Sequence, residues 1–303
     1  MSVVGTGGGL LLVHAHPDDE VFSTGGVIAR TLAEGRRVDL VVCTGGEEGE
    51  VHDPDLDPAE AQPRLRQIRD AELRCSLAAL GAMAATDGLL HLHQLGHRDS
   101  GMMGTAANDR PDAFWQVDLE RAAEPVVRVI REARPRVVVH YDENGGYGHP
   151  DHIQAHRIAL AALTAAADPD RYPAAGQPHR VARRYQTAFG SKDWLGLMVK
   201  MRERDIPLPW GYDEVLDAGD DAEEWPGTVE PAVTTVVDVS TFLEAKRAAM
   251  ACHRTQRQDF GWAIDLPDDL ARLAFGTERF VLVEREGARP PADLTESSLF
   301  EGR

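Results

Sequence analysis

Two histidines, two aspartates and a glutamate lie close together in VHAHPDDEVF, residues 13–22, directly after a short apolar run. Imidazole nitrogens and carboxylate oxygens are both good ligands for zinc. His16 and Asp19 are therefore candidate metal ligands. Successive side chains tend to point in different directions, so Asp18 is expected to face the reactants instead. The alternative interpretation is an acidic surface loop without chemistry.

A second cluster, GYGHPDH at residues 146–152, carries complementary groups. Proline is favoured in the first turn of a helix, so Pro150 predicts a helix start with His152 just inside it. A catalytic zinc typically has three protein ligands and an open position for water. His16, Asp19 and His152 would complete such a set, and the metal would lower the pKa of bound water to about 7.

The remaining groups of the two clusters can assist hydrolysis. Asp18 could remove the proton of the attacking water as a general base. His149, as an imidazolium, could stabilise an oxyanion or protonate a leaving amine, and Asp151 is close enough in sequence to orient it. The Tyr147 hydroxyl could donate to the same oxyanion, although plain packing is its alternative role.

Apolar runs alternate with helical patterns through the first half of the chain. Buried strands are predicted at residues 10–13, 38–44, 89–95 and 137–141, and helices at 64–80, 120–133 and 150–166. This alternation predicts an α/β fold with a mostly parallel sheet and helices on both faces. Ligands bind beyond the carboxyl ends of such strands, so the two clusters and the loop CTGGEEGE should meet at one edge.

The second half of the chain has a less regular pattern. Its predicted elements are strands at 233–239 and 280–283, a helix at 242–253, a loop at 168–178 and an acidic surface segment at 213–230. No clean linker separates the halves, so we expect one domain over residues 1–303. Residues 1–165 would form the metal-binding core, and residues 166–303 would form an elaboration that shapes the substrate pocket. Within it, HRTQRQDF (253–260) would shape the end of the pocket that holds the aglycone.

Composition excludes several classes of partner. The 303 residues carry a formal net charge of −18 and are 43% hydrophobic, which argues against binding nucleic acid or anionic membranes. No apolar run approaches the roughly 18 residues of a membrane span, and the N-terminus lacks the features of a signal peptide. Cys43, Cys75 and Cys252 are far apart, so we expect buried thiols, no disulfide and a cytoplasmic protein. The oligomeric state is left open.

Both clusters together resemble a known family. AHPDDE (15–20) after the first strand and HPDH (149–152) after a later one are similar to the PIG-L/LmbE-like zinc-dependent N-deacetylases. CTGGEEGEV (43–51), HRDSGMMGT (97–105) and YDENGGYGHPDH (141–152) resemble its actinobacterial branch, which removes the acetyl group of N-acetylglucosaminyl-inositol in mycothiol biosynthesis. The match is clear over the first half to two thirds of the chain.

The resemblance implies a Rossmann-like fold, zinc at His16, Asp19 and His152, and Asp18 as the general base. It also implies that His149 and Tyr147 interact with the oxyanion, as the chemistry above suggests. Ferrous iron could occupy the same ligands, since histidine and carboxylate suit both metals.

The family further implies that Glu50, Arg69 and Asp99 bind the sugar and inositol, as hydrogen-bonding partners of hydroxyl groups. Solvated surface charges are their alternative role. The other histidines near strand ends are expected to be core residues or to support ligands, because the three-ligand set is already complete. These are His14, His91, His93, His97 and His140.

Three other functions compete with this one. The first is the mycothiol S-conjugate amidase, in which a lysine commonly follows the first motif and a proline precedes HPDH. Ser23 and Gly148 stand in the matching stretches here and favour the deacetylase. The second is a deacetylase for another N-acetyl sugar conjugate. The third is a non-catalytic, metal-stabilised sugar-binding protein, against which the presence of Asp18 beside the ligands argues.

Overall fold

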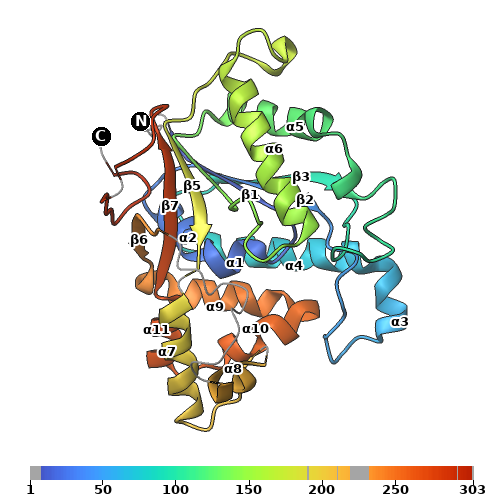
Figure 1. Ribbon diagram of the computed structural model, residues 1–303, viewed down its shortest axis with the longest axis vertical. Coiled ribbons are helices and arrows are strands. Elements are labelled where there is room, and N and C mark those ends of the chain that lie inside the picture. Colours follow the sequence, from blue (N-terminus) through green and yellow to red (C-terminus); the bar gives the residue numbers. More distant parts are fainter. Residues whose placement is uncertain (1–7, 190, 210, 219–231, 292, 302–303) are drawn as a thin grey trace.

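The computed structural model describes residues 8–189, 191–209, 211–218, 232–291 and 293–301 (Figure 1). Its centre is a seven-stranded sheet with the strand order β3-β2-β1-β4-β5-β7-β6. The strands are β1 (Leu10–His14), β2 (Val38–Thr44), β3 (Leu90–His97), β4 (Val137–His140), β5 (Arg183–Ala188), β6 (Thr235–Asp238) and β7 (Thr277–Arg285). β1 to β5 pair in parallel, and β7 runs antiparallel to both β5 and β6. The prediction of a mostly parallel, Rossmann-like sheet is confirmed.

Helices cover both faces of this sheet. They are α1 (Asp19–Ser23), α2 (Gly25–Ala33), α3 (Pro58–Ala61), α4 (Leu65–Gly81), α5 (Leu119–Ala133), α6 (Pro150–Ala167), α7 (Ser191–Arg202), α8 (Tyr212–Ala218), α9 (Leu243–Cys252), α10 (Arg257–Ile264) and α11 (Asp268–Phe275). In Figure 1, α5 and α6 lie on one side of the sheet, and α2, α4 and α9 lie on the other. No helix in the described ranges is both long and apolar enough to span a bilayer.

Alternation along the strands explains why they read as continuous apolar runs. Leu10 and Leu12 of β1 pack into a core shared with α2, α4 and α9. Leu11 and Val13 pack into a second core shared with α5 and α6. Because successive side chains point to opposite faces, a strand buried on both faces needs apolar residues at every position.

The C-terminal half contributes to the same sheet and the same core. β5, β7 and β6 extend the sheet beyond β4, and side chains of α9 and β7 join the core that contains α2 and α4. This continuity supports the single domain expected over residues 1–303, which we retain as a proposal. The expected strand at 280–283 is longer than predicted, and the loop at 168–178 contains a 3-10 turn at Pro173–Ala175. Of the expected acidic segment, residues 219–230 lie outside the described residues, and 213–218 belong to α8.

One prediction about the cysteines is wrong. Cys75 of α4 and Cys252 at the end of α9 form a disulfide, with 5.7 Å between their Cα atoms. The packing of these two helices brings together residues that are 177 positions apart, which the spacing of cysteines in a sequence cannot reveal. Cys43 alone is a buried free thiol, as expected. The low cysteine count therefore no longer argues for a reducing compartment.

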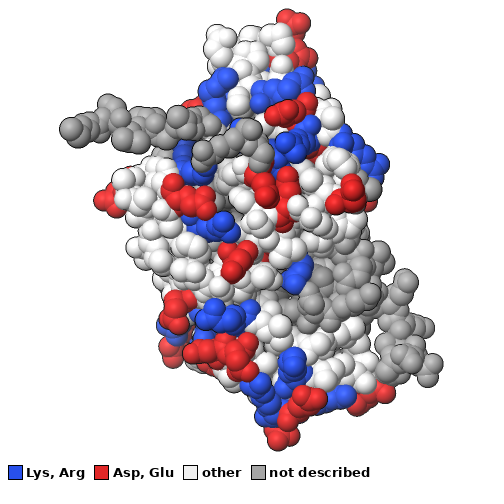
Figure 2. Space-filling model, turned by 90° about the vertical axis from the view of Figure 1, so that its left-hand side faces the viewer, with Lys and Arg blue, Asp and Glu red and all other residues white. Residues whose placement is uncertain are grey.

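Charged side chains of both signs are interspersed on the face of the molecule in Figure 2. Acidic groups on that face lie next to basic ones instead of forming one acidic field. The excess of acidic residues behind the net charge of −18 therefore forms no single patch on this face.

Candidate metal and active site

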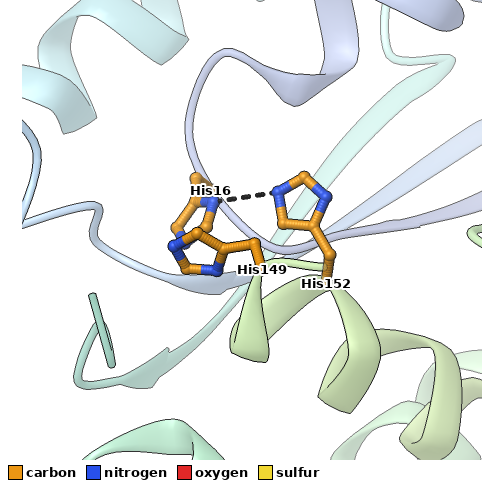
Figure 3. Close-up of side chains that lie close together, drawn as sticks. All are labelled: His16, His149 and His152. Atoms are coloured by element: carbon orange, nitrogen blue, oxygen red, sulfur yellow. Dashed lines mark hydrogen bonds between the residues drawn. The ribbon is translucent and has the colours of Figure 1, made fainter. Parts of the chain in front are cut away.

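The site lies where the strand order reverses, between β1 and β4. His16 and Asp19 follow β1, and His149 and His152 stand at the start of α6, which follows β4. In parallel α/β sheets this switch point is where ligands bind. Figure 3 shows the three histidine rings converging from the two loops. The expectation that the two clusters meet at one edge of the sheet is confirmed.

The three predicted metal ligands lie side by side, with a donor atom of each within 4 Å of the other two residues. Nδ1 of His16 lies 3.3 Å from Nε2 of His152. A carboxylate oxygen of Asp19 lies 3.3 Å from Nε2 of His152, and the other lies 3.6 Å from Nδ1 of His16. Ligands about 2.0–2.1 Å from a tetrahedral zinc are themselves roughly 3.3 Å apart. The donor set therefore has the spacing that one small cation requires.

Hydrogen bonds on the far side of each ring fix the position of one N–H group. Nε2 of His16 donates to the Asp151 carboxylate over 3.2 Å. Nδ1 of His152 donates to the Gly145 carbonyl over 3.1 Å, so Nε2 of that ring can accept. Metal-binding histidines characteristically donate their other N–H in this way. Nε2 of His152 is within hydrogen-bond distance of His16 Nδ1, at 3.3 Å, and a cation bound by both nitrogens would replace this contact.

Two further groupings share these histidines. His16, His149 and His152 also bring one nitrogen each within metal-binding range, as do His16, Asp99 and Asp151 with one atom each. In the second grouping His16 uses the nitrogen that already donates to Asp151, so a metal there would displace that bond. We therefore favour the set with Asp19, which leaves the hydrogen bond between His16 and Asp151 intact.

His149 caps the start of α6. Its Nδ1 accepts the backbone N–H of Asp151 over 3.1 Å, and its ring packs edge-on against His16 with 4.6 Å between centroids. Burial, followed by repulsion from His16 and His152, lowers the pKa of His149 to about 3. An Nδ1 that accepts a hydrogen bond carries no proton, so the ring is neutral with its proton on Nε2. This corrects the expectation of an imidazolium.

Asp151 orients a different histidine from the one expected. Its fully buried carboxylate binds His16 Nε2, and also the backbone N–H of Ser100 over 3.0 Å and the Ser100 hydroxyl. Only the backbone N–H of Asp151 contacts His149. The helix turn separates this carboxylate from the ring two residues earlier and directs it toward the loop after β3.

Asp18 has an unusual backbone conformation, with φ 115° and ψ −28°. Its carboxylate accepts from Nη2 of Arg69 over 2.7 Å, and its backbone N–H donates to Glu20 over 2.8 Å. Burial raises the pKa of Asp18 to about 7 against the lowering effect of the Arg69 guanidinium. Non-glycine residues in such regions are rare and cluster at functional sites.

Tyr147 lies at the rim of the site. Its side chain is 54% exposed, and its hydroxyl is 3.5 Å from Nε2 of His152, the nitrogen that faces the proposed metal position. The ring stands edge-on to His152, with 4.9 Å between centroids. The hydroxyl can therefore reach a substrate bound over the donor set.

The three residues expected to bind substrate have different surroundings. Asp99 is buried, with one carboxylate oxygen 3.7 Å from His16 Nε2 and the other accepting from the backbone N–H of Glu48. Arg69 is also buried and contacts protein groups: Asp18 and the carbonyls of Pro17 and Gly46. Glu50 has an exposed carboxylate paired with His52 over 3.0 Å. Asp99 thus lies beside the candidate ligand His16 and Arg69 beside Asp18, whereas the Glu50 carboxylate faces solvent.

Sequence reasoning missed the partners that support these groups. Glu20, the last acid of the first motif, is fully buried and binds Ser76 and His253. Thr255 donates twice to Glu72 of α4, and Gln256 donates to the Glu50 carbonyl. An acid followed directly by an apolar pair in DEVF was the one available signal for burial of Glu20.

Of the other histidines, several have the supporting roles that were expected. His14 is buried between Tyr141 and Thr24, and His140 is buried and donates to the Tyr141 carbonyl. His93 pairs with Asp39. None of the three belongs to a metal grouping among the described residues.

Comparisons with known proteins agree with this site. Residues 11–163, half of the 303-residue chain, match the model of the PIG-L family, GlcNAc-PI de-N-acetylase. The 1D-myo-inositol 2-acetamido-2-deoxy-alpha-D-glucopyranoside deacetylase of Geodermatophilus obscurus is 43% identical over 97% of both chains. A deacetylase of the same name from Catenulispora acidiphila is 46% identical over 97% of this chain and 88% of its own.

A solved structure has the same fold. The N,N'-diacetylchitobiose deacetylase of Pyrococcus horikoshii superposes with a TM-score of 0.57 over 91% of this chain and 84% of its own. At 17% identity, this likeness concerns the fold alone. The family model and the near-full-length relatives confirm the resemblance found in the sequence, and the chain belongs to the PIG-L family of GlcNAc-PI de-N-acetylases.

Proposed function

We propose that this enzyme is a metal-dependent hydrolase that deacetylates 1D-myo-inositol 2-acetamido-2-deoxy-alpha-D-glucopyranoside, a step of mycothiol biosynthesis. The products are the free amine and acetate. The observation that carries the proposal is the convergence of three ligand atoms beside Asp18 at the switch point of the sheet. The substrate rests on relatives of that name that match nearly the whole chain.

We propose His16, Asp19 and His152 as the ligands of a Zn²⁺ ion, with Fe²⁺ as a metal that the same donors accept. When bound, the metal would polarise the amide carbonyl and lower the pKa of a water molecule. The fit rests on the spacing of the donor atoms of the three residues and on the hydrogen bonds that hold the far nitrogen of each imidazole.

Asp18 is the proposed general base. Asp18 lies between His16 and Asp19 in the loop after β1, and Arg69 holds its carboxylate in place. Asp18 removes a proton from the attacking water as the carbon–oxygen bond forms. The same carboxyl group then delivers that proton to the nitrogen as the carbon–nitrogen bond breaks, so that the amine leaves neutral.

His149 and Tyr147 are the proposed donors to the carbonyl oxygen. With Nδ1 accepting from the backbone, a neutral His149 presents Nε2–H as a donor. The Tyr147 hydroxyl lies 3.5 Å from His152 Nε2, and its ring is 6.1 Å from that of His149 between centroids. Two positioned donors stabilise the negative charge that develops on this oxygen. Asp151 contributes by holding His16, not by acting on His149.

For the substrate, we propose that Asp99 binds sugar hydroxyls and that Glu50 contacts the inositol. Arg69 is better placed to hold Asp18 than to meet the substrate, because its contacts are with protein groups. The substrate is a small molecule, and a cytoplasmic location stays a prediction.

The test is primary-amine release from N-acetylglucosaminyl-inositol, run beside a mycothiol S-conjugate, with and without a chelator. Chelator-sensitive turnover mainly of the first substrate supports the proposal, and preference for the conjugate would assign the chain to the amidase. Asp18→Asn should retain bound metal and lose about 10²–10⁴-fold in turnover. Wild-type turnover by that variant would contradict the assignment of the base.

A further inference from the structure

The backbone at Asp18 is held in place by Arg69 of α4 and by the nearby Glu20. Its φ of 115° is positive, a backbone conformation that residues other than glycine rarely adopt. Arg69 donates to the preceding carbonyl, that of Pro17, and to the Asp18 carboxylate. Glu20 accepts the Asp18 backbone N–H over 2.8 Å. If these contacts were lost, the loop would relax and the carboxylate would turn away.

Glu20 is itself held by two residues from other elements. One carboxylate oxygen accepts from the Ser76 hydroxyl over 2.6 Å and from Nε2 of His253 over 2.7 Å. All three side chains are fully or almost fully buried. Ser76 and His253 each follow one cysteine of the Cys75–Cys252 disulfide, so this link fixes both donors next to Glu20.

We propose that Glu20 and His253 are positioning residues that hold Asp18 in its strained conformation and thereby aim the base at the substrate. The inference rests on the proposed function, because it takes Asp18 as the base. It also assigns a role to the C-terminal third of the chain. His253 lies 233 residues after Glu20 in the sequence, yet through Glu20 it supports the proposed base Asp18 near the start of the chain.

A second buried pair on α9 provides a matched comparison. Lys246 donates to Glu278 over 2.6 Å, and both side chains are as buried as the His253–Glu20 pair. Glu278 accepts the backbone N–H groups of Gly26 and Val27 at the start of α2. No contact described for either residue involves Asp18. Breaking this pair should cost stability without disturbing the base.

The experiment compares His253→Ala, His253→Gln, Lys246→Met, Asp18→Asn and wild type. For each, kcat and KM for deacetylation, zinc per chain and Tm are measured. We expect His253→Ala to lose about tenfold or more in kcat, with KM within about twofold and zinc content unchanged. The amide of His253→Gln can donate to Glu20 and should recover most of this loss. Lys246→Met should lower Tm while kcat stays within about twofold.

If His253→Ala does not fold, Ser76→Ala removes one donor to Glu20 and should lower kcat about threefold at unchanged zinc content. A crystal structure of the folded variant gives a readout independent of turnover, in which Asp18 is expected to relax to negative φ.

Wild-type kcat in His253→Ala, an equal fall in Lys246→Met, or an unchanged Asp18 backbone in the crystal would overturn the inference. A wild-type protein without turnover, or full turnover in Asp18→Asn, would instead contradict the proposed function.

Discussion

Replacing Asp151 tests whether this carboxylate supports the metal site. The side chain is fully buried and holds His16 Nε2 at 3.2 Å, the backbone N–H of Ser100 at 3.0 Å and the Ser100 hydroxyl. It thereby keeps the proton of His16 away from Nδ1 and makes the ring a better ligand. Loss of such a supporting partner typically costs about 10–100-fold in metal affinity.

Asp151→Asn and Asp151→Ala should weaken zinc binding by amounts at opposite ends of that range. In Asp151→Asn the amide oxygen can still accept from His16, and its NH₂ group can donate to the Ser100 hydroxyl, so only the negative charge is lost. We expect about tenfold weaker zinc binding, or ~1.4 kcal/mol. Asp151→Ala leaves the His16 N–H without its acceptor, and we expect about a hundredfold, or ~2.7 kcal/mol.

Zinc affinity would be measured at pH 7 by competition with a chelating indicator. The control is Asp39→Asn. Asp39 accepts from Nε2 of His93 over 2.8 Å in the same kind of carboxylate–histidine pair. It lies at the start of β2, at the opposite end of that strand from the site. The control should therefore lower stability and leave zinc affinity unchanged.

Zinc binding by Asp151→Ala within about threefold of wild type would refute this reasoning. So would an equal loss of affinity in Asp39→Asn, because the effect would then come from general loosening of the sheet and not from His16.

Three further predictions concern the rim of the site, the disulfide and acid stability. Tyr147→Phe should lower kcat by about tenfold, less than the ~10²–10³-fold typical of an oxyanion donor, because water can reach this exposed residue and partly replace its hydroxyl. This is measured by kcat and KM for the deacetylation, and a change in KM alone would contradict the role. Replacing Cys75 and Cys252 by serine should lower the free energy of unfolding by about 2–5 kcal/mol in urea denaturation, and a reductant should have no further effect on that variant. Burial raises the pKa of Asp39, but hydrogen bonds and positive charge from His93 and Arg37 together outweigh burial and hold that pKa below its usual value. Its contribution to stability is therefore present above the ordinary aspartate pKa of about 4 and is lost as pH falls toward the folded-state value. Unfolding measured from pH 7 to pH 3 should show a steeper acid loss in wild type than in Asp39→Asn, and parallel curves would contradict this.

The parallel core of the fold could be predicted because its strands are buried on both faces. Residues 10–13 are all apolar and residues 38–44 are apolar except for Asp39 and Thr44, and the helices between such strands require crossover connections. The antiparallel β7 was harder to delimit. Its side chains alternate between buried and half-buried, and its charged ends do not resemble a strand.

The site could be predicted where its chemistry is local in sequence. His16 and Asp19 are three residues apart, and His152 belongs to an equally compact motif. Long-range partners left no such trace. Glu20 and His253 are 233 residues apart, and Cys75 and Cys252 are 177 apart, so only the packing of α1 and α4 against α9 brings them together.

Arg69 makes contacts that suggest a different role from the one expected from the sequence. Resemblance to the family placed it among the substrate-binding residues, and the structure places it at the site. Nη1 donates to the Gly46 carbonyl over 2.8 Å, and Nη2 donates to Pro17 and Asp18. A Cβ atom on Gly46 would lie 2.2 Å from Nη1, so the guanidinium fills a space that only glycine leaves open. With these nitrogens committed to the loop of the base, Arg69 stabilises the negative charge of Asp18, as Glu20 holds its backbone. The base therefore depends on α4 and, through Glu20 and His253, on α9, so its geometry is set by the packing of those helices.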